Sequence, residues 1–275
     1  MIYLGTAGWH YNHWNGTFYP RNIDNELAFY SNHSLLNEIN MTFYRIPSES
    51  MINRWYGSTP EDFIFSAKLF REITHVSRPT VKTDKIVMFF SRMRGLREKL
   101  RSILIQFPPS FCNTRGNFSF LNQILEKCTD LFSGQIFLEI RNDSWFTDEV
   151  KDRLKALAIS LAETTTLSIP EDYQNEKIPL YYIRLLGSRQ LIPDEKLGKF
   201  FLDKNKERKA WARKLVELSK RYNTIFVLIN NRFSGYAIND AISLRKILTK
   251  QNVLTQGFEQ DDMYIKRQMS LGEFF

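Results

Sequence analysis

Polar side chains interrupt several apolar runs of the chain at the points where those runs end. One run ends with Glu38 and Asn40, and a later run ends with Glu139 and Arg141, each pair two residues apart. Because side chains two residues apart point to the same face of a strand, the members of each pair project together. A carboxylate beside a guanidinium is suited to acid–base chemistry on an anionic ligand.

Residues at the ends of other runs extend this pattern. We predict that catalysis is carried by Glu38, Lys68, His75 and Glu139. The predicted substrate-binding residues at the ends of runs are Asn40, Gln106, Arg141, Arg184, Asn230 and Asn231. For any single position the alternative is a structural role, in which polar groups close the end of the fold by pairing with one another and with loop backbone. For the whole set we favour a functional site.

Aromatic residues gather in the same loops. Trp9 and Tyr11 follow the first run, Tyr44 follows the second and Trp145 follows the fifth. Aromatic side chains most often belong to a core, but in loops they can form a stacking wall for a planar or sugar-like ligand. We therefore predict that these four rings bind substrate.

Short strand-like runs must position these side chains. Eight β-branched or aromatic runs occur, at residues 2–6, 35–39, 63–67, 102–106, 135–140, 157–162, 180–185 and 224–229. Stretches with helical periodicity lie between most of them, at residues 24–34, 49–56, 84–101, 118–131, 148–155, 194–222 and 237–250, with Ser48, Thr83 and Asn117 as start signals. Eight alternating units predict an α/β fold, a single (β/α)8 TIM-type barrel, in which all strand ends meet at one mouth.

Composition favours one intracellular domain. We predict a barrel over residues 1–250 and a tail over residues 251–275, without a membrane span or a secretory signal. Cys112 and Cys128 have no metal-ligand partner at short spacing and are interpreted as packing residues, which suits the cytoplasm. Lys and Arg outnumber Asp and Glu by 38 to 30, giving a net charge of +8 that favours polyanionic partners.

The cofactor is unknown from the sequence. A divalent ion held by Glu38, His75 and Glu139 is one alternative. We favour a metal-free pocket in which Lys68, Arg141 and Arg184 pair with the carboxylates, because the chain has only 4 histidines.

Seven ordered motifs resemble a known family. They are GTAGW at 5–9, EINMTFYRIP at 38–47, ITH at 73–75, QFPPSF at 106–111, EIR at 139–141, YIR at 182–184 and NN at 230–231. In this order they resemble the YecE-like family, domain of unknown function 72, which implies a β/α barrel with a polar pocket and no established general activity. The chain departs from the pattern at Leu186, where the family has His, at Arg232, where it has an acidic residue, and at Ala7, where Ser is common.

The last eight residues carry a separate motif. Residues 268–275 resemble the peptide that binds the PCNA-type sliding clamp, in which Gln268 hydrogen-bonds beside a pocket that takes an aliphatic and two aromatic side chains. Those side chains are Leu271, Phe274 and Phe275. The alternative is a tail that docks on its own barrel.

The stretch 194–222 is rich in Lys and Arg, and we interpret it as a solvated surface helix rather than a face that follows phosphates. Together these features predict a DNA-acting enzyme, a hydrolase or nuclease in DNA repair or replication that the clamp recruits. One alternative is a barrel enzyme for a sugar or phosphorylated metabolite. Another is a non-catalytic DNA-binding protein associated with the clamp.

Overall fold

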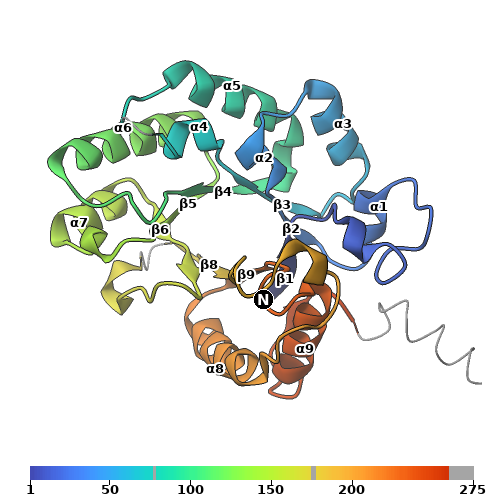
Figure 1. The fold of residues 1–275 in the computed structure, drawn as a ribbon. Coiled ribbons are helices and arrows are strands. Elements are labelled where there is room, and N and C mark those ends of the chain that lie inside the picture. The colour runs from blue at the N-terminus through green and yellow to red at the C-terminus, as the bar shows by residue number, and fades with distance from the viewer. Residues whose placement is uncertain (77–78, 175–177, 260–275) are drawn as a thin grey trace, which may run out of the picture. The chain divides into compact units, whose positions relative to one another are not determined.

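The structure is a computed structural model and describes residues 1–76, 79–174 and 178–259. Its contacts divide the chain into two compact units. The first unit contains Met1–Asn37, Ser58–Phe63 and the chain from Ile183 onward, and the second contains Glu38–Gly57 and Ile64–Tyr182. Each unit is a set of parallel strands with helices beside them (Figure 1).

The first unit is built on two long parallel strands. Strand β1 (Ile2–Ala7) pairs with β9 (Thr224–Ile229), with Ile2 opposite Ile225, and also with the short β10 (Thr255–Gln256). The helices are α1 (Glu26–Ser31), α8 (Asn205–Arg221) and α9 (Ala237–Thr249), with short 3-10 turns η1 (Asn12–Trp14) and η5 (Asp194–Lys196). Helices α8 and α9 pack against each other beside β9 (Figure 1).

The second unit repeats the strand–helix alternation. Its strands β3 (Ile64–Lys68), β4 (Leu100–Gln106), β5 (Gln135–Glu139) and β6 (Ser160–Leu161) are successive parallel neighbours. The other elements are α2 (Met41–Tyr44), α3 (Glu49–Gly57), α4 (Arg71–Thr74), α5 (Thr83–Met93), η2 (Arg94–Lys99), α6 (Arg115–Leu131), η3 (Asp143–Trp145), α7 (Asp148–Ala156), β7 (Glu163–Thr164) and η4 (Glu171–Tyr173). Strands β2 (Leu36–Ile39) and β8 (Leu180–Leu185) contribute residues to both units.

The strands are buried over nearly their whole length. In β9, Ile225 to Ile229 are all buried, and in β4 the residues from Ser102 to Gln106 are all buried. Strands covered on both faces carry continuous apolar runs rather than alternating ones, which explains why these runs stood out in the sequence. The predicted α/β class is confirmed, with parallel strand–helix units that are consistent with a TIM-like barrel.

The predicted helix over residues 194–222 is wrong in its first half. Helix α8 begins only at Asn205. The segment before it makes backbone hydrogen bonds to another loop, from Gly198 N to Gly235 O at 2.8 Å and from Phe201 N to Ser234 O at 2.9 Å. Gly198 also has a φ of 78°, in the left-handed region that ends a helix. Only the later half of the stretch is therefore helical.

The ends of other elements also differ from the predicted ones. Helix α5 stops at Met93 and continues as a 3-10 turn, inside which Arg97 has a φ of 50° that breaks the helical path. The cap of α6 is Thr114, whose side chain accepts from Asn117 N, so Asn117 is inside the helix. Helix α5 begins at Thr83, which is therefore not its cap. The Ser48 cap of α3 is confirmed by its hydrogen bond from Met51 N at 3.3 Å.

Two smaller predictions can be assessed from exposure. Cys128 is buried as predicted, but Cys112 is exposed, which corrects its interpretation as a packing residue. In the part of the chain that the structure describes, none of the helices has the length and apolar character that crossing a bilayer requires.

Candidate functional site

Three consecutive strands of the second unit end in polar residues that meet. Lys68, Gln106 and Glu139 are the last residues of β3, β4 and β5, and Gln106 lies opposite Glu139 in the strand register. All three are buried. Lys68 Nζ donates a hydrogen bond to Gln106 Oε1, and Gln106 Nε2 lies 3.3 Å from His75 Nε2. We call Lys68, His75, Gln106, Glu139 and Arg141 the strand-end cluster.

An ion pair forms the second half of this cluster. Arg141 Nε donates to Glu139 Oε1 at 2.6 Å, a charge-assisted hydrogen bond between side chains on the same strand face. The Glu139 side chain is 0% exposed, whereas 29% of the Arg141 side chain is exposed. The carboxylate is therefore held in the interior by a guanidinium that also reaches solvent.

His75 is half-buried between the cationic residues. Burial, and then the charges of Lys68, Arg141 and Arg71, lower the pKa of His75 from 6.5 to about 4, although Glu139 opposes them. The imidazole is neutral at neutral pH, where it can position a group or accept a proton. Of the predicted catalytic residues, His75 is therefore better suited to accepting a proton than to donating one, because an imidazolium is needed to donate.

Phe43 packs against both His75 and Lys68. The ammonium of Lys68 lies 4.0 Å from the centre of the Phe43 ring, and the His75 ring meets Phe43 edge to face at 4.9 Å. Thr42, in the same turn, donates from Oγ1 to the backbone oxygen of Lys68 at 2.7 Å. The turn after β2 therefore fixes the end of β3, and Asn40 lies at the start of this turn.

Glu38 lies deeper in the second unit. Its Oε2 accepts from Tyr182 OH at 2.8 Å, and Tyr182 OH is also 2.8 Å from Ser66 Oγ. Glu38 and Tyr182 are both fully buried, and Tyr182 packs on Phe137 at 4.7 Å between ring centres. Glu38 is thus part of a buried polar network.

The four predicted aromatic ligands have different surroundings. Trp145 is a core residue, only 2% exposed, with Nε1 donating to Phe111 O at 2.6 Å and its ring stacked on Phe111 at 4.9 Å. This corrects the prediction that Trp145 binds substrate, because both its ring and its N–H are engaged. Tyr44 is 66% exposed, whereas Trp9 and Tyr11 are half-buried and the Tyr11 hydroxyl donates to Ala7 O.

A pocket of about 300 Å³ lies in the first unit, where β9 ends. Its lining residues are His10, Tyr11, Asn12, His13, Asp194, Leu197, Asn230, Asn231 and Arg232. Three of the predicted substrate-binding residues, Tyr11, Asn230 and Asn231, therefore share one pocket. Arg184, another predicted substrate-binding residue, belongs to the same unit and is only 2% exposed.

The sequence did not identify several residues of these two regions. His10 and His13 were not among the predicted site residues, and Asp194 was placed at the start of an α-helix that begins only at Asn205. Tyr182 was not distinguished from the core-facing aromatics around it. Thr42 and Phe43 lie in one of the family motifs, which was the available signal for them.

A metal site can be tested against the positions of candidate ligands. Within residues 1–76, 79–174 and 178–259 there is no group of three or more His, Cys, Asp and Glu side chains that could hold an ion. Glu38, His75 and Glu139 thus do not form such a group. The predicted clamp-binding residues Gln268, Leu271, Phe274 and Phe275 lie outside the described residues.

The chain is similar to UPF0759 proteins of bacteria. It is 26% identical over 274 residues to the UPF0759 protein YunF of Bacillus subtilis (strain 168), which covers 90% of this chain and 95% of that protein. It is 29% identical over 111 residues to the UPF0759 protein YecE of Escherichia coli (strain K12), covering 40% of this chain and 39% of that protein.

Solved structures have the same fold. The crystal structure of a DUF72 family protein from Thermotoga maritima MSB8 has a TM-score of 0.71 and 26% identity, covering 90% of this chain and 99% of that chain. A DUF72 family protein from Enterococcus faecalis V583 also has a TM-score of 0.71, at 22% identity, covering 90% and 96%. The sequence profile of the protein family of unknown function DUF72 matches residues 3–262. The resemblance predicted from the seven motifs is confirmed, and the chain belongs to the DUF72 family.

Proposed function

We propose that the strand-end cluster is the active site of a hydrolase that acts on DNA. The observation that carries this proposal is the meeting of Lys68, Gln106 and the Glu139–Arg141 pair on three consecutive strand ends. The carboxyl ends of parallel strands are where barrel enzymes carry out their chemistry. The proposal includes the finer form of the fold, a single closed (β/α)8 barrel.

Each residue of the strand-end cluster has a separate role in the proposed hydrolysis. Lys68 and Arg141 bind the non-bridging oxygens of a phosphodiester, since a guanidinium and an ammonium both pair well with phosphate. Glu139 accepts the proton of the attacking water, and Gln106 orients Lys68 through the hydrogen bond to its ammonium. Neutral His75 positions the water. As the water oxygen bonds to phosphorus, the P–O bond to the leaving oxygen breaks, and that oxygen takes up a proton from solvent. Arg184, which was predicted to bind substrate, is buried in the first unit and is not assigned to this cluster.

Glu38 has a supporting role in this scheme. Its carboxylate accepts from the hydroxyl of Tyr182. Glu38 and Glu139 are both fully buried, but only Glu139 is paired with a guanidinium that reaches solvent, so Glu38 is better suited to setting the field of the site than to meeting water directly. Glu139 is therefore the residue that we assign as the base.

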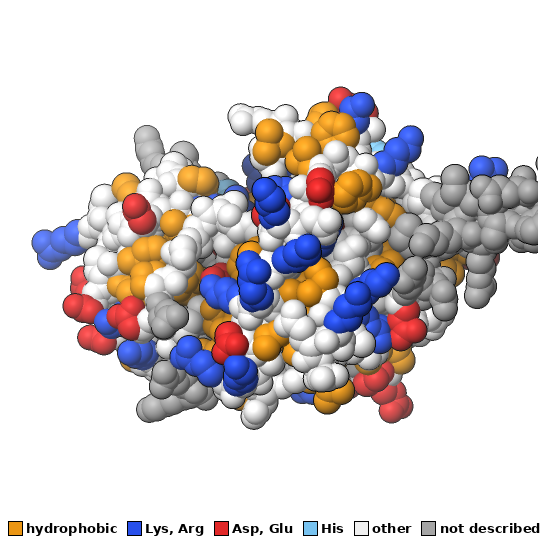
Figure 2. All heavy atoms as spheres, turned by 90° about the horizontal axis from the view of Figure 1, so that it is seen from below, with side chains coloured by type: hydrophobic (Ala, Val, Ile, Leu, Met, Phe, Trp, Pro, Cys, Tyr) orange, Lys and Arg blue, Asp and Glu red, His pale blue; other side chains and the backbone are white. Residues whose placement is uncertain are grey.

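Two features support DNA as the substrate: the positive charge of the surface and the clamp-binding motif of the tail. The face over α8 and α9 shows many Lys and Arg side chains (Figure 2). The outer side chains Lys206, Lys209 and Arg213 of α8 are exposed, whereas Leu215 and Leu218 are buried. This is the solvated helix that the sequence favoured, and it adds to the positive field that attracts a polyanion. Residues 268–275 supply the proposed contact with a PCNA-type clamp.

Tyr44 lies in α2 next to Phe43 and is exposed. Of the predicted rings it is therefore the best placed to stack on an unpaired base. Trp9 and Tyr11, which are half-buried, belong to the first unit and stay predictions of ligand contact there. Trp145 is removed from the proposal, because its ring is already stacked.

Cleavage of labelled DNA tests the proposal. The purified full chain is incubated with single-stranded, nicked and damaged duplex DNA, with and without divalent ions. Cleavage of at least one substrate is expected, and Glu139→Gln should abolish it because the base is lost. Glu126→Gln is the matched control, since Glu126 also pairs with an arginine, Arg153, but on the surface helices α6 and α7.

The outcome also separates the alternatives. Binding of DNA without cleavage of any substrate, unchanged by Glu139→Gln, would favour the non-catalytic clamp-associated protein. Absence of both binding and cleavage would favour the enzyme for a sugar or phosphorylated metabolite, for which the pocket of about 300 Å³ has a suitable size.

The tail is tested separately with a synthetic peptide of residues 266–275. Burial of an aliphatic and two aromatic side chains contributes roughly 5 kcal/mol before ordering costs, which is compatible with micromolar affinity. The peptide should bind the clamp of the source organism in calorimetry, and replacing both Phe274 and Phe275 by Ala should abolish binding. If neither the peptide nor the full chain binds, the role of the clamp is rejected.

A further inference from the structure

Two adjacent carboxamides follow β9 in the first unit, and their oxygens are both occupied. Asn231 Oδ1 accepts from the indole Nε1 of Trp14 at 3.2 Å and from the backbone N of Ala237 at 3.0 Å. Asn230 Oδ1 accepts from the backbone N of Arg232 at 2.9 Å. Indole and backbone N–H groups can only donate, so these bonds fix which side-chain atom is oxygen.

The side-chain nitrogen of Asn231 consequently points away from Trp14 and Ala237. Asn231 is 2% exposed, and its Nδ2 has no hydrogen-bond partner in the described chain. An unsatisfied buried donor costs about 1–3 kcal/mol, so such a group calls for an acceptor from outside the protein. Asn231 lines the pocket of the first unit, which is therefore where this acceptor would lie.

The other groups around the pocket are mostly donors or neutral. Arg232, His10 and His13 line it, and Asp194 is its one acidic lining residue. Two arginines neutralise Asp194, with Arg189 Nη2 at 2.7 Å from Oδ2 and Arg232 Nη2 bound to Oδ1. The pocket is thus rich in donors and carries no uncompensated negative charge that would repel an anion.

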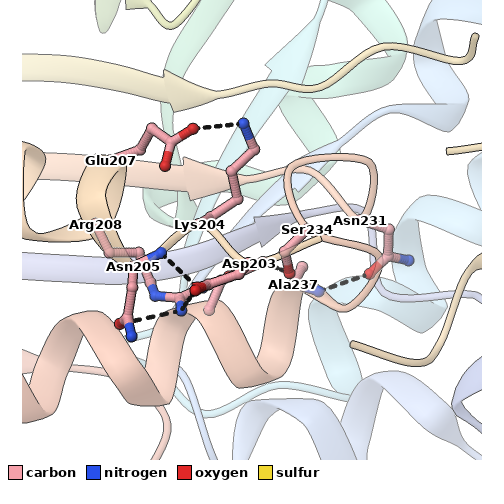
Figure 3. Close-up of polar contacts among 9 residues, drawn as sticks. Asp203, Lys204, Asn205, Glu207, Arg208, Asn231, Ser234 and Ala237 are labelled. Atoms are coloured by element: carbon pink, nitrogen blue, oxygen red, sulfur yellow. Dashed lines mark hydrogen bonds and ion pairs between the residues drawn. The ribbon is translucent and has the colours of Figure 1, made fainter. Parts of the chain in front are cut away.

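A buried ion pair holds the loop that carries both carboxamides. Arg208 Nη1 donates to Asp240 Oδ1 at 2.7 Å, and Ser234 Oγ donates to Asp240 Oδ2 at 2.5 Å. Figure 3 shows Asn231 joined to Ala237, with the side-chain nitrogen of Asn231 directed away from that contact. Since the loop is fixed from α8 and α9, the donor is preorganised before any ligand arrives.

We propose that this pocket binds an oxyanion, the phosphoryl group of a small molecule or of a nucleotide, with Asn231 Nδ2 as its buried donor. The carboxamide of Asn230 and the guanidinium of Arg232 complete the recognition. Preformed N–H donors around a compact space are the usual means of holding phosphate oxygens. The inference stands independently of the hydrolytic role proposed for the strand-end cluster.

Asn231→Asp tests the proposal with almost no change of shape. The carboxylate keeps two oxygens to accept from Trp14 and Ala237, but it removes the two N–H donors and places negative charge beside the anion. Binding of inorganic phosphate is followed at constant ionic strength by NMR of the side-chain amides and of the backbone amides of residues 230–232, which all variants retain. We expect a saturable shift of the Asn231 amide in the wild type, and binding at least about tenfold weaker in Asn231→Asp.

Two further variants keep the result interpretable. Asn223→Asp introduces the same charge at an exposed position of the first unit and should leave phosphate binding unchanged. Asn230→Asp, which retains an acceptor for Arg232 N, should weaken phosphate binding and provides the test if Asn231→Asp does not fold. Equal affinities of the wild type and a folded Asn231→Asp or Asn230→Asp variant would overturn the proposal, as would absence of saturable binding by the wild type.

The same titration with a short single-stranded DNA distinguishes the two sources of the phosphoryl group. A shift of the Asn231 amide by inorganic phosphate and not by DNA assigns the pocket to a small phosphorylated ligand. A shift by both, weakened by Asn231→Asp, assigns it to nucleotide phosphate. A shift caused only by a neutral sugar would contradict the oxyanion proposal.

Discussion

The strand-end cluster of the second unit and the pocket of the first unit both lie where parallel strands end, but they satisfy their polar groups differently. In the cluster, the side chains pair with one another, as Glu139 does with Arg141 and Lys68 with Gln106. In the pocket, the Asn231 oxygen is held by the protein while its Nδ2 has no partner among the described residues. A site whose charges neutralise one another is suited to moving protons, whereas an unsatisfied rigid donor is suited to binding.

The largest expected effect concerns the support of the pocket. Asp240→Ala leaves the buried Arg208 guanidinium without its close partner and should lower the free energy of unfolding by about 3–5 kcal/mol in urea titrations. Asp203→Ala removes an exposed carboxylate 3.8 Å from the same arginine and should cost about 1 kcal/mol or less. Equal losses for the two variants would show that the buried pair is not what stabilises this loop.

The second-largest expected effect is the dependence of DNA affinity on salt concentration. If Lys68, Arg141 and another cation neutralise phosphates, raising salt from about 50 to 200 mM should weaken binding roughly 40-fold, because counterions are released. Fluorescence anisotropy with labelled DNA measures this slope. If DNA affinity does not change with salt concentration, DNA is not the ligand, and both the cluster and the pocket would bind small molecules.

A smaller effect is expected when the exposed partner of the ion pair is removed. Arg141→Met should weaken DNA binding and also cost about 1–3 kcal/mol of stability, because Glu139 then stays buried without its guanidinium. Adding Glu139→Gln should restore part of that stability. Arg153→Met, which breaks the surface pair with Glu126, should cost less than about 1 kcal/mol. Thermal unfolding distinguishes these cases.

The smallest expected effect is on the pH dependence of the free energy of unfolding, to which one titratable group in each unit contributes with opposite sign. The folded-state pKa of His75 is lowered from 6.5 to about 4, so the unfolded chain binds the extra proton and stability is lost as pH falls from 6.5 to 4. Burial raises the pKa of Asp240 to about 6, although Ser234 and Arg208 oppose it, so stability is lost as pH rises from 4 to 6.

Urea titrations between pH 4 and pH 6 should therefore show opposite slopes for the two contributions. His75→Gln should remove a rising slope and Asp240→Asn a falling one, each on the order of 1 kcal/mol over this range, since His75 is half-exposed and Asp240 is paired. Changes of the same sign would contradict the different environments assigned to the two groups.

The extent to which the sequence predicted these regions follows from their local structure. Lys68, Gln106 and Glu139 end buried strands, where apolar runs and the period of two determine position and face. Trp145 was misassigned because a loop ring can be stacked on another aromatic residue, here Phe111, which a one-dimensional pattern does not show. Cys112 was predicted to be a packing residue but is exposed, because the sequence pattern does not show which side of a loop faces solvent.

The pocket was harder to predict because its parts come from irregular segments. Asp194 precedes a stretch that lacks helical structure since its backbone bonds with the loop at Ser234 and Gly235. His13 and Arg232 belong to loops with no periodicity, so no pattern linked them before the fold was known. Arg232 was noted only as a departure from the family motif, which was the single signal available.

The most direct test of the catalytic role of the strand-end cluster is a single-turnover cleavage rate, measured with excess protein over a labelled DNA substrate that binds. We predict that Glu139→Gln lowers this rate by about 10²–10⁴-fold while DNA affinity changes little, because the carboxylate acts on the water rather than on the phosphate. Glu126→Gln should cleave at the wild-type rate. A Glu139→Gln variant that is folded and cleaves as fast as the wild type would contradict the assignment of the cluster as the active site.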